Sequence, residues 1–255
     1  MAHLSDINFQ RTYFLGEGYE GVKNRAYKIL EKYSRYPNLF TFNDKDKSVT
    51  FVTERLIPAT FTNKPRVLLL FSNPHPHSIF QGMFLSPNTR GRENPFWPTM
   101  RDAGWLTIDK EDRSPEQLAE ICLNLNYQRP FDLIFYCYYA FPTDYPEDIR
   151  RIFGKEFFEQ SIEPEAMDEF KKIIQETNVD AVITFNKGIF NLVSKDQITK
   201  YIERLIDGEL IRSKISGFDG NIPIFLTFPT GWRYHRKSGD FRKSSLKNIR
   251  AAIGS

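Results

Sequence analysis

The sequence contains little cysteine and no long apolar segment, and each scarcity excludes a class of protein. Cys122 and Cys137 are the only cysteines among 255 residues, which is too few for a disulfide framework or a Cys₄ metal cluster. The first residues, MAHLSDINFQRT, lack the apolar centre of a signal peptide. No apolar run approaches the roughly 20 residues that a membrane helix needs. These features predict a cytoplasmic protein that has no membrane partner.

Common nucleotide-binding and catalytic signatures are absent as well. No G-x-x-x-x-G-K-[ST] occurs, and no predicted strand is followed by G-x-G-x-x-G. The G-x-S-x-G turn of α/β-hydrolases is missing too. His75 and His77 lie close in sequence, but two histidines are fewer than the three or four ligands that a structural or catalytic metal site requires. We therefore expect neither a metal ion nor a cofactor.

Aromatic and basic residues are plentiful, and the basic ones gather near the C-terminal end. The chain has 23 Phe and 12 Tyr, most of which we expect in the core. Its net charge is only +3, but residues 231–250 carry seven Lys or Arg against a single acid, Asp240. Basic groups neutralise phosphates and exposed rings stack on bases, so this segment favours nucleic acid as a partner. A solvated surface loop is the alternative. The residues assigned to DNA binding are Trp232, Arg233, Tyr234, His235, Arg236, Lys237, Arg242 and Lys243.

The order of the predicted elements indicates an α/β protein. Four short apolar runs are expected as buried strands, and helical patterns lie between them. The predicted strands are 67–71, 132–139, 181–185 and 222–228. Ser114, Pro115 and Gln117 match the preferences of a helix start. Repeated strand–loop–helix units predict a three-layer α/β/α fold with a central, mainly parallel, four-stranded sheet.

Three of the predicted strands end in similar proline-containing segments. These are Asn73-Pro74, Phe141-Pro142-Thr143 and Phe228-Pro229-Thr230-Gly231. In a parallel sheet the three segments lie on one edge, where open α/β folds place their ligands. We interpret residues 1–255 as a single domain, in which 1–60 form an extension with a helix and a strand and 61–255 form the core.

The loop after the first core strand carries a recognisable pattern. An Asn-Pro pair follows the strand, a Gly comes nine positions later, and a Phe-Trp pair and an Ala-Gly belong to the next helix. The residues concerned are Asn73, Pro74, Gly82, Phe96, Trp97, Ala103 and Gly104. The pattern resembles the first motif of the uracil-DNA glycosylase superfamily, most closely its mismatch-specific and single-strand-selective branches. Residues 228–233, Phe-Pro-Thr-Gly-Trp-Arg, resemble the second motif and its DNA-wedging loop, so the resemblance covers about 60–253.

The resemblance implies hydrolysis of an N-glycosidic bond after the base has been flipped out of the stack. Asn73 would position the attacking water, and residues 232–235 would fill the gap in the DNA. A turn residue before proline is the simpler interpretation of Asn73. His75 and His77 stand where a new acid could act, because histidine titrates near neutral pH. Hydrogen bonding within the loop is the alternative for both.

The residues that would choose the base depart from the family pattern. Leu85 stands where a Phe platform is expected, and Phe84 precedes it. No Asn ends the second core strand, and Cys137 or Tyr138 falls at that place. Phe228 replaces a His or Asn of the second motif. A pocket without the amide should discriminate weakly for uracil. The predicted base pocket is Phe84, Leu85, Cys137, Tyr138 and Phe228.

The sequence thus predicts a metal-independent, monomeric, monofunctional DNA glycosylase, a hydrolase of N-glycosyl bonds. It would remove a damaged or modified pyrimidine other than plain uracil from double- or single-stranded DNA. Base-excision repair and antiviral defence against modified phage DNA both fit such an activity. Three alternatives stay open: a non-catalytic nucleic-acid-binding protein on the same fold, a uracil or mismatch repair glycosylase, and an unrelated α/β enzyme for a small phosphorylated or nucleoside substrate.

Overall fold

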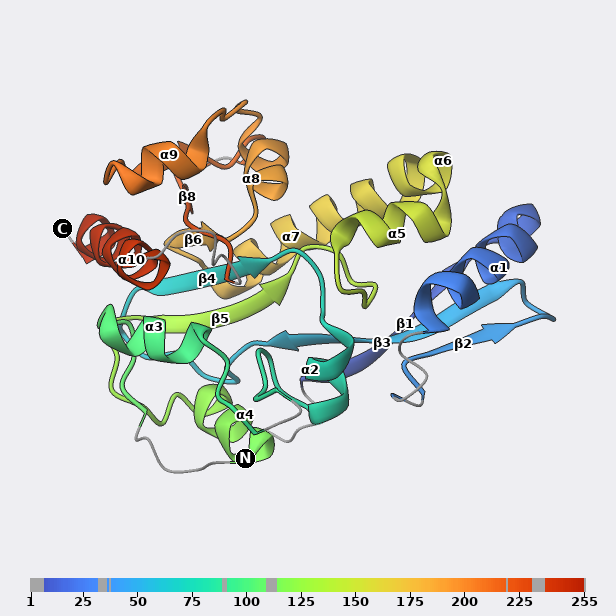
Figure 1. The fold of residues 1–255 in the computed structure, drawn as a ribbon, viewed down its shortest axis with the longest axis horizontal. Helices are drawn as coiled ribbons and strands as arrows, with labels where there is room; N and C mark the ends of the chain where they lie inside the picture. Colours follow the sequence, from blue (N-terminus) through green and yellow to red (C-terminus); the bar gives the residue numbers. More distant parts are fainter. Residues whose placement is uncertain are drawn as a thin grey trace.

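The described part of the chain is built around one eight-stranded mixed sheet (Figure 1). The structure is a computed structural model and describes residues 7–31, 36, 38–88, 91–108, 114–218, 220–230 and 237–254. Strands follow each other across the sheet in the order β1-β3-β5-β4-β6-β8-β7, and β2 pairs with β3. They are β1 (Asn8–Phe14), β2 (Phe40–Asn43), β3 (Ser48–Leu56), β4 (Arg66–Phe71), β5 (Asp132–Cys137), β6 (Ala181–Thr184), β7 (Ile211–Lys214) and β8 (Pro223–Leu226).

Helices connect most of these strands. They are α1 (Tyr19–Leu30), α2 (Pro76–Gln81), α3 (Phe96–Asp102), α4 (Pro115–Leu123), α5 (Pro146–Phe153), α6 (Lys155–Phe157), α7 (Glu163–Thr177), α8 (Lys187–Ser194), α9 (Tyr201–Ile206) and α10 (Ser238–Gly254). A π-helical stretch, Phe158–Ile162, joins α6 to α7. None of the described helices is long and apolar enough to cross a membrane.

The four strands predicted from the sequence form the parallel centre of the sheet. β4 lies between β5 and β6, and β8 lies beyond β6. The chain therefore leaves β4 for a neighbour on one side, and later adds β6 on the other side. Such a switch of direction opens a crevice at the carboxyl ends of the two strands concerned, here β4 and β6. This edge is where the sequence places the Asn73 loop.

The sheet has eight strands rather than the four predicted. On one side, β3 pairs antiparallel with β5, and β1 and β2 pair antiparallel with β3. β7 adds antiparallel to β8 at the other end. Residues 1–60 thus contribute strands to the same sheet as the core. Their pairing is non-local, and short polar segments such as Ile-Arg-Ser-Lys of β7 carry almost no apolar period that reveals it.

Helices pack on both faces of the sheet, as the three-layer prediction requires. One face buries residues of α1, α5, α7 and α8, with Phe170 and Phe190 among the fully buried rings. The other face buries residues of α3, α4 and α10, including Trp97 and Leu246. Indole Nε1 of Trp105 donates a hydrogen bond to the Leu246 carbonyl at 3.0 Å, which attaches the loop after α3 to α10.

The predicted start of α4 is confirmed in atomic detail. Ser114 accepts a hydrogen bond from the Gln117 N–H at 3.3 Å, and the Gln117 amide oxygen accepts one from the Ser114 N–H at 2.9 Å. This reciprocal capping box satisfies two donors that a helix leaves open. Asn186 caps α8 in a related way through the Ile189 N–H at 3.1 Å. α2, in contrast, has only six residues and no apolar period long enough to predict it.

Candidate active site at the carboxyl edge of the sheet

The Asn73 side chain is held rigidly between the ends of β4 and β5. Its Nδ2 donates to the Thr143 carbonyl at 2.6 Å and lies 3.1 Å from Thr143 Oγ1. Its Oδ1 accepts from Ser72 Oγ at 2.9 Å. Because the Thr143 carbonyl can only accept, these contacts fix which end of the amide faces it. An amide oxygen has two lone pairs, so Oδ1 can accept a further bond from water.

Backbone hydrogen bonds hold the same two loops together beyond the strands. Tyr138 and Tyr139 N–H groups donate to the Phe71 and Ser72 carbonyls at 2.9 and 2.8 Å. The Thr143 N–H donates to the Pro74 carbonyl at 3.2 Å. Two of the three proline-containing strand ends thus converge as predicted. Thr143 was expected only as a strand end, but it is the residue that orients Asn73.

His75 lies at the start of α2, with its side chain about half exposed. Its Nδ1 accepts from the His77 N–H at 3.2 Å, and its Nε2 lies 3.1 Å from Asp144 Oδ1. In the neutral ring the proton therefore sits on Nε2 and faces the carboxylate. Asp144 orients the imidazole. The sequence interpretation missed Asp144, although it follows the strand-end proline segment directly.

The His77 ring connects two other segments by hydrogen bonds, so it is not free to act as an acid. Its Nε2 lies 2.7 Å from the Pro87 carbonyl, which can only accept, so Nε2 carries the proton. Its Nδ1 then accepts from the Tyr36 hydroxyl at 3.2 Å. Both ring nitrogens are occupied within the protein. Of the two predicted acids, His75 is the more exposed, although both of its ring nitrogens have protein partners as well.

The five predicted base-pocket residues do not gather around one cavity. Phe84 and Cys137 are buried in the core on one face of the sheet, whereas Tyr138 and Phe228 are buried in the core on the other. Successive residues of an extended chain point to opposite faces, so the neighbours Cys137 and Tyr138 cannot share a pocket. Leu85 is half-buried in a turn with φ +53°, and its carbonyl accepts from Trp97 Nε1 at 3.0 Å.

Aromatic rings pack together at the carboxyl ends of β4 and β6. Phe71 ends β4, and Phe185 follows β6; their rings stack with centroids 5.1 Å apart and planes 10° apart. Phe96 meets both rings edge-on at 5.8 Å. The sequence interpretation did not single out Phe185, whose contact with Phe71 depends on the strand order.

A buried carboxyl lies on the same face, and no sequence pattern indicates it. Glu54 of β3 is 3% exposed, and its Oε2 has no hydrogen-bond partner among the described residues. Burial raises the pKa of Glu54 well above its ordinary value of 4.5. The pKa of the nearby Cys137 thiol is raised as well, by burial first and by Glu54 second. A glutamate in a strand that alternates in polarity is normally read as solvent-facing.

Glu54→Gln is expected to remove a pH dependence of stability. The folded state binds a proton at Glu54 that the unfolded chain releases near pH 4.5, so this group's contribution falls as pH rises from 4.5 through the raised pKa. The variant should gain on the wild type across that window by up to about 1.4 kcal/mol per pH unit. Urea denaturation at pH 5 and pH 8 measures this. A difference that stays constant with pH would contradict it.

The basic segment is described only from Lys237 onwards. Residues 232–235, predicted to wedge into DNA, and Arg236, predicted to contact phosphate, lie outside the described residues. Lys237 is exposed just before α10. Arg242 Nη1 donates to the Thr230 carbonyl at 2.7 Å and so ties α10 to the end of β8. Lys243 Nζ lies 3.8 Å from Asp240. The described basic residues thus lie near the carboxyl edge of the sheet, where Arg242 contacts the loop after β8.

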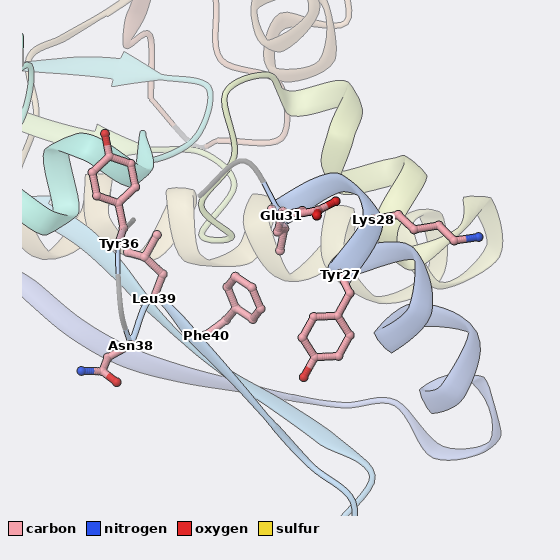
Figure 2. A pocket seen from close by; sticks show the side chains of 8 residues that line it. Tyr27, Lys28, Glu31, Tyr36, Asn38, Leu39 and Phe40 are labelled. Atoms are coloured by element: carbon pink, nitrogen blue, oxygen red, sulfur yellow. The ribbon is translucent and has the colours of Figure 1, made fainter. Parts of the chain in front are cut away.

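A pocket of about 530 Å³ lies away from this edge, between α1 and the start of β2 (Figure 2). Tyr27 of α1 and Phe40 of β2 are among its lining residues. Tyr36 also lines it, and the hydroxyl of Tyr36 contacts His77. This contact connects the pocket to the Asn73–His77 loop.

The segment Gly16–Gly21 corrects one negative prediction. It reads GEGYEG, follows β1 and leads into α1, so a G-x-G-x-x-G does follow a strand. The dinucleotide fingerprint also requires a parallel β-α-β unit. β1 pairs antiparallel with β3, so that context is missing. In the described part of the chain, no group of three or more His, Cys, Asp or Glu side chains is arranged to hold a metal ion.

Comparison of the sequence with models of known protein families finds no match, and comparison with curated proteins finds none either.

Proposed function

We propose that the protein is a DNA glycosylase that hydrolyses the N-glycosidic bond of a flipped-out modified pyrimidine. One observation carries the proposal. The Asn73 amide is locked in one orientation on the β4 loop, at the same edge as the Phe228–Thr230 loop that follows β8. Only β6 separates β4 from β8, which sets the two loops roughly 10 Å apart by the usual strand spacing. In the proposal, the flipped-out nucleotide binds at this edge.

The residues supply the parts that such a hydrolysis needs. Asn73 Oδ1 orients the water whose oxygen bonds to C1′ of the sugar. The bond from C1′ to the base breaks, and its electron pair leaves with the base. In the proposed step His75 binds a proton at Nδ1, which requires the bond from the His77 N–H to open, gives that proton to the departing base and takes one back from the water. The product is a free base and an abasic sugar, and the dissociated transition state demands little from the weak amide base.

Incubation with modified oligonucleotides tests the proposal directly. Duplex and single-stranded DNA carrying uracil, mismatched thymine, 5-hydroxymethylcytosine or glucosylated 5-hydroxymethylcytosine is incubated with the protein and then treated with alkali. Strand breakage at a modified pyrimidine is expected. If none of these substrates breaks, the glycosylase proposal is wrong. Preference for the glucosylated base would favour a role in defence against modified phage DNA over repair.

A non-catalytic DNA-binding protein is the second candidate. The burial of Phe84, Cys137, Tyr138 and Phe228 favours it, because the described structure has no open base pocket among these residues. Tight binding of DNA with no cleavage of any substrate would select this candidate.

Both candidates require phosphate contacts from the basic segment. Lys237→Ala and Lys243→Ala are each expected to weaken DNA binding several-fold and to reduce the slope of log affinity against log salt by roughly one. Lys172→Ala is the matched control. It removes an exposed lysine near the C-terminal end of α7, which leads to the opposite edge of the sheet. Equal losses in all three variants, in fluorescence anisotropy titrations at two salt concentrations, would mean that the segment is not the contact surface.

A further inference from the structure

Asn8, Glu54 and Cys137 form a polar row across neighbouring strands, in which Glu54 and Cys137 are buried and Asn8 is partly buried. Asn8 of β1 lies opposite Glu54 of β3. β3 and β5 pair Leu56 with Phe135 and Arg55 with Tyr136. The next step of this antiparallel register sets Glu54 opposite Cys137. Directly opposed residues point to the same face of a sheet, so the three side chains are neighbours on one face.

The row continues to Phe71 at the carboxyl end of β4. Cys137 lies opposite Phe71, whose ring stacks on Phe185. Phe71 immediately precedes Ser72 and Asn73. Two strand spacings, roughly 10 Å, separate Glu54 from Phe71 along this row. Glu54 therefore belongs to the same surface as these aromatic rings.

The polar part of this row has hydrogen-bonding capacity that its described neighbours do not use. Glu54 Oε2 and Asn8 Oδ1 are both buried without a partner among the described residues. Asn8 Nδ2 donates to the Ile79 carbonyl at 2.9 Å. This bond fixes the orientation of the Asn8 amide, and its Oδ1 therefore points away from Ile79. A protonated Glu54 that donates to Asn8 would satisfy one oxygen of each. Without that proton both atoms stay unsatisfied, and an unsatisfied buried polar group is costly, so this place requires either a proton on Glu54 or a donor from a bound group.

We propose that Glu54 binds the edge of the base held at this site, in place of the amide that the second core strand lacks. The inference rests on the proposed function. A neutral carboxyl presents one donor and one acceptor in a plane, as an amide does. Its proton can occupy either oxygen. It can therefore pair with N3 and the 4-amino group of a cytosine or with N3–H and O4 of a uracil. The substrate class is accordingly pyrimidines of both kinds, and selection among them must come from other positions of the ring.

Glu54→Leu and Glu54→Gln together test this assignment. Leucine removes both hydrogen-bonding functions, and we expect kcat/KM on 5-hydroxymethylcytosine and uracil duplexes to fall about tenfold to a hundredfold. Glutamine keeps an uncharged donor and acceptor, and it should stay within about threefold of the wild type. Thr53→Val, at a buried position on the opposite face, controls for disturbance of β3. Both Glu54 variants should melt at or above the wild-type temperature at pH 7, since neither carries a charge to bury.

The outcomes separate this inference from the proposed function. If Glu54→Leu cleaves as fast as the wild type, or if Glu54→Gln is as inactive as Glu54→Leu, the proposed role of Glu54 is wrong. The glycosylase proposal is unaffected by either result. Calorimetry with free cytosine and free uracil covers the other case. If no duplex is cut but both bases bind, and Glu54→Leu alone loses them, base recognition holds and the glycosylase fails. If no duplex is cut and no base binds, both are wrong.

Discussion

Asn73→Ala is expected to slow base excision about 100-fold or more, the usual loss when one preorganised polar group is removed from an active site. Alanine cannot hold the attacking water. It also breaks the bonds to Thr143 and Ser72, at a cost in stability of about 1–2 kcal/mol. The catalytic loss should therefore exceed anything that partial unfolding explains. Single-turnover cleavage of the preferred substrate, at a temperature where the variant is fully folded, measures it.

Asn186→Ala provides the matched control for this prediction. Asn186 follows the adjacent parallel strand β6 at the same edge, but its side chain caps α8. Its loss should cost about 1 kcal/mol of stability and little activity. Equal loss of activity in the two variants would mean that Asn73 acts through the loop structure alone. Full activity in Asn73→Ala would remove it from the mechanism.

Much of the core fold follows from local sequence, because its signals are short-range. The apolar run that becomes β4 and the capping box of α4 can each be recognised within a few residues. The strands β1, β2 and β7 could not be recognised from local sequence. They owe their place to pairing with distant segments, as when Asn8 pairs with Glu54. The position of the extension within the main sheet follows from that pairing and not from any local pattern.

The candidate site was predictable at its backbone and not in its side chains. Proline-containing strand ends placed Asn73 and Thr143 at one edge, because parallel strands end together. Strand alternation then sends Cys137 and Tyr138 to opposite faces, which a linear comparison with a motif ignores. The burial of Glu54 could not be predicted from the sequence for a different reason. Its burial is produced by packing against β1 and β5, which the sequence of β3 does not encode.

Asp132 stabilises the opposite, amino-terminal edge of the sheet, and it does so as a fully buried ion. Its carboxylate accepts from the Thr62 N–H at 2.6 Å, from the Thr62 hydroxyl at 2.9 Å and from Arg129 Nε at 2.9 Å. The Asp132 side chain is 0% exposed and that of Arg129 is 7% exposed. The carboxylate therefore joins the loop before β4 to the start of β5, and it neutralises a guanidinium that water barely reaches.

Asp132→Ala is expected to destabilise the protein by about 3–5 kcal/mol, because it leaves the Arg129 charge buried without its partner. That is a large part of the roughly 5–15 kcal/mol that stabilises a typical domain. Asp180→Ala is the matched control. This exposed aspartate accepts one backbone hydrogen bond at the amino end of β6, from the Arg66 N–H at 2.7 Å, and its loss should cost about 1 kcal/mol.

A double variant decides whether the buried charge is the cause. If it is, Arg129→Met should recover part of the stability lost in Asp132→Ala, so that the two effects are not additive. Urea denaturation of the wild type, both single variants and the double variant gives the coupling directly. Additive losses would instead assign the cost to the Thr62 hydrogen bonds. Because this edge lies across the sheet from Asn73, the folded fraction of each variant should retain wild-type base excision, which separates the stability of the sheet from the chemistry at its carboxyl edge.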